Sequence, residues 1–246
     1  MGRRAFLREC VLGGATLLGI LPAAAEPAGD QPATGGRKVR YGMAVDVDKC
    51  LGCGRCVEAC KSENAVPREP FFFRTWVERY TVHEDGRVTV ESPNGGIGGF
   101  RAPEGDGDVL RTFFVPKLCN HCTNAPCVQV CPVGATFSTP EGVVLVDREY
   151  CIGCRYCIQA CPYGARYLDP ETRTAEKCTF CYHRITRGLQ PACVEACPTD
   201  ARVFGDLEQR SSPLARFLRF SKVDVLKPHL NTEPKVFYAS LDGVVD

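Results

Sequence analysis

The hydrophobic pattern changes character several times along the chain. Residues 11–21 form a nearly continuous apolar run, whereas residues 71–82 combine aromatic and β-branched residues, as a strand does. Arg87–Glu91 has the composition of a hairpin partner for that strand, and Thr112–Val115 is a third candidate strand. The pattern therefore predicts a β-hairpin insertion within residues 62–117.

The second half of the chain gives shorter signals. Val143–Val146 and Arg166–Leu168 predict two short strands between cysteine-rich segments. Ser212–Phe220 has the spacing of a short amphipathic helix, and Lys235–Ala239 predicts a final strand. These last two lie in a tail, residues 206–246, that contains no cysteine. The tail is suited either to capping the domain before it or to strapping onto a partner.

The N-terminal segment has the order of an export signal rather than of a folded element. Residues 1–25 begin with a charged part, continue through the apolar run and end in small residues. The pair Arg3 and Arg4 resembles the twin-arginine signal, which predicts export in the folded state to an extracytoplasmic location. A retained signal anchor and an ordinary secretory signal are the alternatives. Residues 26–40 are predicted to be a linker. Cys10 lies within the signal and is not expected to bind a cofactor.

Composition singles out cysteine. The chain has 246 residues, 44% of them hydrophobic and 24% charged, which is ordinary for a globular protein. It has 17 cysteines, and disulfide-rich scaffolds are usually much shorter, so metal binding is favoured over disulfides. The net charge of +1 provides no basic surface for nucleic acid. No later segment is long and apolar enough to predict a membrane-spanning helix.

Sixteen of the cysteines fall into four copies of one spacing. In every copy the last two cysteines stand four residues apart, and a proline follows the closing cysteine in three copies; Lys61 follows it in the first. The copies are Cys50, Cys53, Cys56 and Cys60; Cys119, Cys122, Cys127 and Cys131; Cys151, Cys154, Cys157 and Cys161; and Cys178, Cys181, Cys193 and Cys197.

This spacing has a mechanical meaning. The short steps at the start of a copy let a tight loop wrap one cube, and Gly52 and Gly153 permit the unusual backbone angles of such a loop. The step of four is one helical turn, so the closing cysteine points away and binds a different cluster, as in bacterial two-cluster ferredoxins. A zinc knuckle has no use for a third cysteine at this spacing, and disulfides do not explain the repetition.

The copies then pair into modules. Copies two and three lie close in sequence and form an inner module, residues 118–170, nested between copies one and four within a four-cluster domain over residues 41–205. The fold class expected is α+β, with two pseudo-symmetric ferredoxin-like dicluster modules. Four [4Fe–4S] clusters follow, bound through iron by Cys50, Cys53, Cys56 and Cys197 (the Cys50 set); Cys60, Cys178, Cys181 and Cys193 (the Cys60 set); Cys131, Cys151, Cys154 and Cys157 (the Cys131 set); and Cys119, Cys122, Cys127 and Cys161 (the Cys119 set).

Polar neighbours of the cysteines are candidates for tuning the clusters. A nearby cation stabilises the reduced, more negative cluster, and a histidine N–H can bind a sulfur atom. Each of these residues is also consistent with an ordinary solvated side chain. The candidates are Lys177, Lys117, Arg155 and Arg55 as cations, and His121 and His183 as donors.

Several stretches together resemble a known family. Residues 161–167, 174–181, 191–198 and 225–228, with the four cysteine copies, are similar to the electron-transfer subunit of the dimethyl-sulfoxide-reductase superfamily. With the export signal, they are most like the periplasmic iron–sulfur subunits of tetrathionate and polysulfide reductases. The resemblance covers residues 41–245.

The resemblance implies two partners, a molybdopterin-containing catalytic subunit and a quinol-handling integral membrane subunit. It places the Cys50/Cys197 cluster nearest the molybdenum partner and the Cys119/Cys161 cluster nearest the membrane. The chain would be peripheral to the membrane, on its periplasmic side.

No nucleophile and base, phosphate-binding loop or substrate site is evident in the sequence, so a non-catalytic electron-transfer subunit is expected. One alternative is an iron–sulfur subunit of a quinone-linked respiratory complex without a molybdenum subunit. A diffusible polyferredoxin and a structural zinc protein are the others.

Overall fold

The computed structural model describes residues 38–69, 71–102 and 109–245. The expected signal peptide, most of the expected linker and Cys10 lie outside the described residues. Residues from Lys38 onward form one compact unit. Within the described ranges, no helix has the length and apolar character needed to cross a membrane.

A four-stranded sheet joins the two ends of this unit. Its strands, in order across the sheet, are β10 (Val223–Asp224), β11 (Val236–Ala239), β1 (Tyr41–Asp46) and β9 (Arg202–Asp206). β1 pairs parallel with β11 and antiparallel with β9. The buried side chains of Met43, Phe204 and Tyr238 extend this sheet into the main hydrophobic core.

The C-terminal tail therefore packs within the same compact unit as the cysteine-rich residues. Helix α6 (Pro213–Phe220), capped by the Ser212 hydroxyl, packs against β9. The segment after η2 (Pro228–Leu230) then returns to the cysteine loops, where the Lys235 amide donates to the Asn120 carbonyl at 2.9 Å. The tail supports the second cysteine copy from within the same chain.

A second sheet consists of the predicted insertion strands. β2 (Thr75–His83) lies between β3 (Val88–Glu91) and β4 (Val109–Leu118), and both pairings are antiparallel. β2 begins at Thr75 rather than at Phe71, which is exposed and has a positive φ of 90° that a strand does not allow. The short η1 helix (Pro93–Gly96) follows β3.

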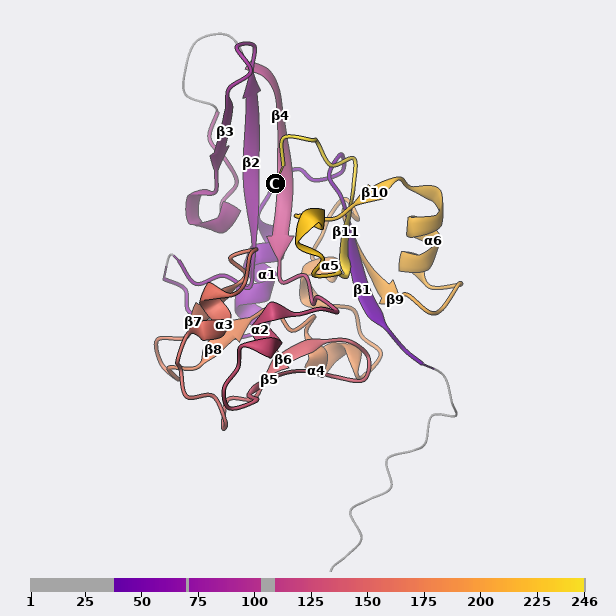
Figure 1. Ribbon diagram of the computed structural model, residues 1–246. Coiled ribbons are helices and arrows are strands. Elements are labelled where there is room, and N and C mark those ends of the chain that lie inside the picture. Colours follow the sequence, from indigo (N-terminus) through magenta and orange to yellow (C-terminus); the bar gives the residue numbers. More distant parts are fainter. Residues whose placement is uncertain (1–37, 70, 103–108, 246) are drawn as a thin grey trace, which may run out of the picture. The chain divides into compact units, whose positions relative to one another are not determined.

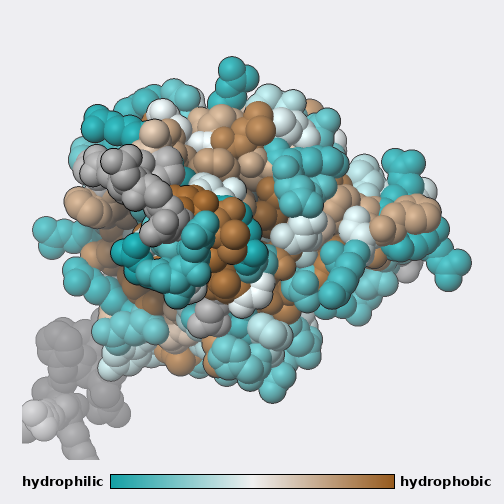
Figure 2. Space-filling view, turned by 90° about the horizontal axis from the view of Figure 1, so that it is seen from above, coloured by the Kyte–Doolittle hydropathy of each residue, from teal (hydrophilic) through white to brown (hydrophobic). Residues whose placement is uncertain are grey.

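The two ends of this sheet differ in their surroundings. Figure 1 shows β2 and β4 running side by side, from helix α1 to the turn that joins β2 to β3. Figure 2, which views the molecule from above, shows apolar side chains among polar ones, and Val90, Val109 and Leu110 of these strands are exposed. At the other end, Val77, Val115 and Leu118 enter the core beside the cysteines.

Short elements carry the cysteines themselves. Four helices begin one residue before the third cysteine of their copy, as the one-turn spacing predicts. They are α1 (Arg55–Glu63), α2 (Pro126–Gln129), α3 (Tyr156–Gln159) and α5 (Ala192–Glu195), and a further helix, α4 (Tyr182–Ile185), follows Cys181.

Two antiparallel hairpins complete the cysteine-rich part. β5 (Thr136–Ser138) pairs with β6 (Val144–Val146), and β7 (Arg166–Leu168) pairs with β8 (Ala175–Lys177). β5 follows the closing cysteine of the second copy, and β7 follows that of the third. The hairpins thus carry the chain from one cysteine loop to the next.

Candidate cluster-binding sites

The first loop of every cysteine copy turns through a left-handed residue. The residue two places after the first cysteine has a positive φ in all four copies, and this turns its amide toward the sulfur side of the loop. These residues are Gly52 (66°), His121 (43°), Gly153 (68°) and Phe180 (53°). The amides of His121 and Phe180 donate to the first sulfurs of their copies, Cys119 Sγ at 3.5 Å and Cys178 Sγ at 3.4 Å.

The Cys50 set surrounds one cavity. Its lining includes all four of its cysteines, together with the side chain of Arg202. Burial raises the pKa of Cys50 to about 11, and the nearby thiols of Cys56 and Cys197 act in the same direction. Cys53 is exposed, so this site reaches the protein surface.

The Cys60 set surrounds a second cavity, which is more enclosed by protein. Cys60, Cys178, Cys181 and Cys193 all line it and are all buried. Burial, followed by repulsion from the other three thiols, raises the pKa of Cys60 well above its ordinary value. The structure therefore brings copy one and copy four together across more than a hundred residues of sequence.

The Cys119 set is also one group. Burial raises the pKa of Cys122 to about 11, and Cys119, Cys127 and Cys161 add to the effect through their charges. Four buried cysteines remain protonated unless positive charge is present, because their thiolates would repel one another. A metal cluster whose irons bind the thiolates would supply that charge.

The Cys131 set lies on two adjoining loops. The Asp147 amide donates to the Ala135 carbonyl at 2.7 Å, and the Cys151 amide donates to the Asp147 carbonyl at 3.1 Å, so backbone bonds hold the two loops together. Burial raises the pKa of Cys131, but amides including that of Thr136 outweigh it, and the net shift is downward. Cys154 is exposed. This set therefore reaches the surface at Cys154, whereas Cys157 is buried.

The four sets adjoin one another in a fixed order. Cys56 lies near enough to Cys193 to help raise its pKa, so the Cys50 and Cys60 sets are neighbours. Cys119 likewise helps raise the pKa of Cys178, so the Cys60 and Cys119 sets are neighbours. The Arg166 guanidinium acts on thiols of both the Cys119 and the Cys131 sets. The sets therefore follow one another in the order Cys50 set, Cys60 set, Cys119 set and Cys131 set.

This order corrects an expectation drawn from the resemblance, which placed the Cys119/Cys161 cluster at the end of the path. The loop of copy two faces the loop of copy four instead. The rings of His121 and Phe180, at equivalent positions in those loops, stack with their centroids 3.7 Å apart. The Cys119 set is therefore internal, and the Cys131 set is the outer one.

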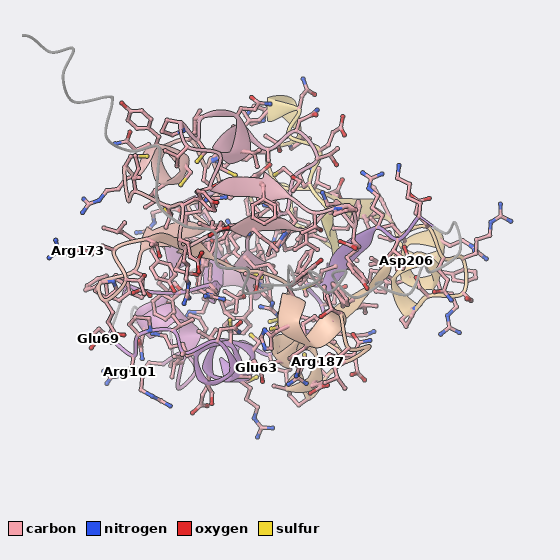
Figure 3. The ribbon with its side chains drawn as sticks, turned by 90° about the horizontal axis from the view of Figure 1, so that it is seen from below. Glu63, Glu69, Arg101, Arg173, Arg187 and Asp206 are labelled. Atoms are coloured by element: carbon pink, nitrogen blue, oxygen red, sulfur yellow. The ribbon has the colours of Figure 1, made fainter. Side chains whose placement is uncertain are left out.

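His121 is held in one tautomer. Its Nδ1 accepts a hydrogen bond from the Val144 amide at 3.1 Å, so the proton is on Nε2, and burial lowers the pKa of the ring well below its usual value. Nε2 has no hydrogen-bond partner within the described residues. Within the described ranges His183 forms no hydrogen bond to a sulfur, contrary to expectation, and its Nε2 contacts Glu63 Oε1 at 2.7 Å instead. Figure 3 shows Glu63 beside the segment after α4 that carries Arg187.

The cations predicted from sequence proximity mostly lie elsewhere. Lys177 is buried among the cysteines, where its ammonium donates to the Cys178 carbonyl at 2.8 Å. Lys117 instead pairs with Glu78 at 2.9 Å. Arg55 and Arg155 are exposed, although each adjoins a cysteine in sequence.

The sequence reasoning missed the arginines that do reach sulfur. Arg202 donates to Cys56 Sγ at 3.4 Å, and Arg166 donates to Cys127 Sγ at 3.1 Å. Each follows an alanine, five residues after the closing cysteine of its copy. This repeated Ala–Arg pair is the sequence signal that could have identified them.

Lys61, which replaces the proline of the other copies, has a structural explanation. Without the proline, α1 continues past Cys60 to Glu63. The Asn64 side chain after it lies 3.7 Å from Cys60 Sγ and 3.6 Å from Cys181 Sγ, within reach of a weak hydrogen bond to sulfur. The Lys61 ammonium donates to the Pro67 carbonyl at 2.7 Å.

The chemistry of these sites suits a sulfur-rich anionic group. The sixteen cysteines in the described ranges form no disulfide. Each set supplies soft thiol ligands, and amide or side-chain N–H groups point at several of the sulfurs, which is how proteins bind iron–sulfur clusters.

Comparison with known proteins agrees with this chemistry. Models of a 4Fe–4S dicluster domain match residues 49–135 and 110–207. The chain is 41% identical over 243 residues to a tetrathionate reductase subunit of Salmonella typhimurium, covering 98% of this chain and 88% of the relative. It is 48% identical over 205 residues to a tetrathionate reductase subunit of Archaeoglobus fulgidus (83% and 84% covered). It is 34% identical over 254 residues to an arsenate respiratory reductase iron–sulfur subunit of a Shewanella species (84% and 98% covered).

Gly54→Ala is expected to remove the cluster of the Cys50 set. Gly54 has a φ of +72°, and a methyl group there would overlap the Gly96 carbonyl. A backbone clash of this kind costs about 1–3 kcal/mol and would displace the loop of Cys53 and Cys56. The expected result is a loss of about four irons per chain, the content of one [4Fe–4S] cluster, measured by iron analysis of the purified protein.

Gly164→Ala is the matched control. Gly164 also has a positive φ, +62°, but a methyl group there meets no atom within 4 Å. It should retain its iron. Full iron content in the Gly54→Ala variant would contradict the expected effect of the clash with the Gly96 carbonyl.

Proposed function

Since the chain belongs to the iron–sulfur subunits of the dimethyl-sulfoxide-reductase superfamily, we propose that it relays electrons between a membrane quinol subunit and an extracytoplasmic molybdopterin oxidoreductase. The observation that carries this proposal is the uninterrupted series of four cysteine sets. Each set adjoins the next, and the series reaches the surface at both ends, at Cys53 and at Cys154. A series of adjoining redox sites that reaches the surface at both ends is suited to carrying electrons through the protein.

The proposed cofactors are four [4Fe–4S] clusters, one in each of the Cys50, Cys60, Cys119 and Cys131 sets. Their iron chemistry would supply the one-electron steps. The grouping around two cavities and the mutual repulsion within the Cys119 set support the assignment. In this arrangement copies two and three form a module nested inside the module of copies one and four.

The exposed ends are suited to partners. Leu51 is exposed beside Cys53, whereas Tyr150, Ile152 and Tyr156 are exposed beside Cys154. Aromatic residues are enriched at protein interfaces, and large apolar side chains left in water suit the core of such a contact. We assign the Cys50 end to the molybdopterin subunit and the Cys131 end to the quinol subunit.

The acceptor proposed is tetrathionate or a related sulfur compound, because relatives named as tetrathionate reductase subunits align over most of their length. The N-terminal pair Arg3 and Arg4 supports twin-arginine export and a periplasmic location. A folded, cluster-loaded protein requires an export route of that kind.

Paired cysteine variants test the ligand sets. The unchanged protein should hold about sixteen irons and as many acid-labile sulfides, four of each per cluster. Cys56→Ala with Cys197→Ala removes two ligands of one set and should lose about four irons. Cys56→Ala with Cys60→Ala removes ligands of two sets and should lose about eight.

A model in which each copy binds its own cluster gives the opposite ranking of these two variants. Cys10→Ser, outside the four copies, is the control and should keep all iron. Fewer than about twelve irons in the unchanged protein would exclude four clusters.

The relay itself is tested in the complex purified from its host. Menadiol should drive tetrathionate reduction, and Cys154→Ala with Cys157→Ala should lower that rate at least about tenfold, because electrons enter at the Cys131 end. Reduced methyl viologen, which donates to the complex elsewhere, should still drive the reaction. Equal rates of menadiol-driven reduction in the unchanged complex and in the double variant would contradict the relay.

The composition of the purified complex tests the alternative function. A complex with haem and no molybdenum would support an iron–sulfur subunit of a quinone-linked respiratory complex.

Export is tested by replacing the arginine pair. Arg3→Lys with Arg4→Lys preserves charge but removes the twin-arginine signal, so the full-length chain should accumulate in the cytoplasm with its iron bound. Cell fractionation and immunoblotting measure this. Unchanged periplasmic accumulation would contradict the proposed route.

A further inference from the structure

Two buried arginines occupy equivalent places in the sequence. Arg166 lies five residues after Cys161, and Arg202 lies five residues after Cys197. Each is the first residue of a strand, β7 or β9, and their exposures are 5% and 2%. Burying a charged guanidinium is unfavourable unless other groups compensate for the lost water, so two such positions require a reason.

Arg202 points into the cavity of the Cys50 set. Its Nη2 donates to Cys56 Sγ at 3.4 Å and to Thr75 Oγ1 at 2.9 Å. The Thr75 hydroxyl is fixed in turn by donating to the Lys117 carbonyl at 2.7 Å. Nη1 is buried and has no hydrogen-bond partner in the described ranges. A donor without a partner beside this cavity is suited to a further sulfur acceptor in it.

Arg166 makes the corresponding contacts in the other module. Its Nη2 donates to Cys127 Sγ at 3.1 Å and its Nη1 donates to Thr136 Oγ1 at 3.3 Å. Nε is buried without a partner among the described residues. Both arginines therefore donate to the third cysteine of a copy and to one threonine hydroxyl.

Neither arginine is neutralised by a carboxylate. In the described part of the chain, Arg166 and Arg202 form no ion pair with Asp or Glu, whereas buried Arg74 pairs with Glu176 at 2.6 Å. The charge of each is therefore available to the thiolates. The equivalent positions of copies one and two carry Ala65 and Thr136, so each pair of copies has one such arginine.

We infer that Arg202 and Arg166 raise the reduction potentials of the clusters to whose cysteines they donate, the Cys50 set for Arg202 and the Cys119 set for Arg166. This inference rests on the ligand sets of the proposed function. Reduction adds one electron, and hence one negative charge, to a [4Fe–4S] cluster. A fixed, buried positive charge and an N–H bond to sulfur both stabilise the reduced form.

No proton accompanies this effect. The guanidinium stays protonated in both oxidation states, because arginine is not deprotonated in proteins. The contribution of each arginine to the potential is therefore independent of pH. A potential set by proton uptake would change by about 59 mV per pH unit for a one-electron couple, which is the value for a tenfold change in equilibrium.

Redox titration with dithionite, followed by EPR of the full chain, tests the inference. Arg202→Gln should lower the reduction equilibrium of the Cys50-set cluster by about tenfold, a shift of about 59 mV to more negative potential. A smaller shift is expected at the Cys60 set, because Arg202 also acts on its Cys193. Arg166→Gln should shift a different signal. Arg202→Lys keeps a positive charge and should recover part of the shift. The shifts should be equal at pH 7 and pH 8.

Arg55→Gln is the matched control, because Arg55 adjoins Cys56 in sequence but is exposed. It should leave all four potentials unchanged. Iron analysis separates failure of the ligand sets from failure of the inference about the arginines. Too little iron in the unchanged protein would contradict the ligand sets and would not bear on the arginines. Full iron content with no shift in Arg202→Gln, or an equal shift in all four clusters, would overturn the inference.

Discussion

Thiols crowded into a buried site resist ionisation, since each negative charge raises the pKa of its neighbours and water is not present to screen them. Sixteen cysteines in four sets make this the dominant electrostatic problem of the molecule. Several features together offset this unfavourable ionisation. Loop amides donate to sulfur, Lys177 lies among the cysteines, and Arg166 and Arg202 extend guanidinium groups to two of the sets. The iron of the proposed clusters would supply the remaining positive charge.

The backbone is shaped by the same requirement. A loop that points amides at sulfur needs a left-handed residue, and each copy has one at the same position. Glycine meets this need without strain in copies one and three. Copies two and four use His121 and Phe180 instead, whose rings stack where the two loops face each other. The cost of a non-glycine residue there, about 1 kcal/mol or more, is offset by contact between the loops.

Much of this was predictable because cysteine spacing is a local signal. The step of four predicted the helices at the third cysteines. The aromatic and β-branched composition predicted β2 and β3, and amphipathic spacing predicted the helix after Ser212. The order of the sets was not predictable, because it depends on which loops meet in space. Arg166 and Arg202 were missed for a related reason. They are distant in sequence from the sulfurs they contact, whereas Arg55 is adjacent to Cys56 and points to solvent. The place of the tail depended in the same way on long-range strand pairing.

The parallel pairing of β1 with β11 has a consequence for biosynthesis. β1 is the first strand described and β11 the last, and nearly two hundred residues separate Met43 from its register partner Val236. The ribosome releases the first strand long before its neighbour is made, so the sheet cannot close until synthesis is nearly finished. Until then the β1 backbone groups that pair with β11, and the Asn120 carbonyl that accepts from the Lys235 amide, lack these partners. The late strand thus leaves the nascent chain open during the period in which metal can be inserted.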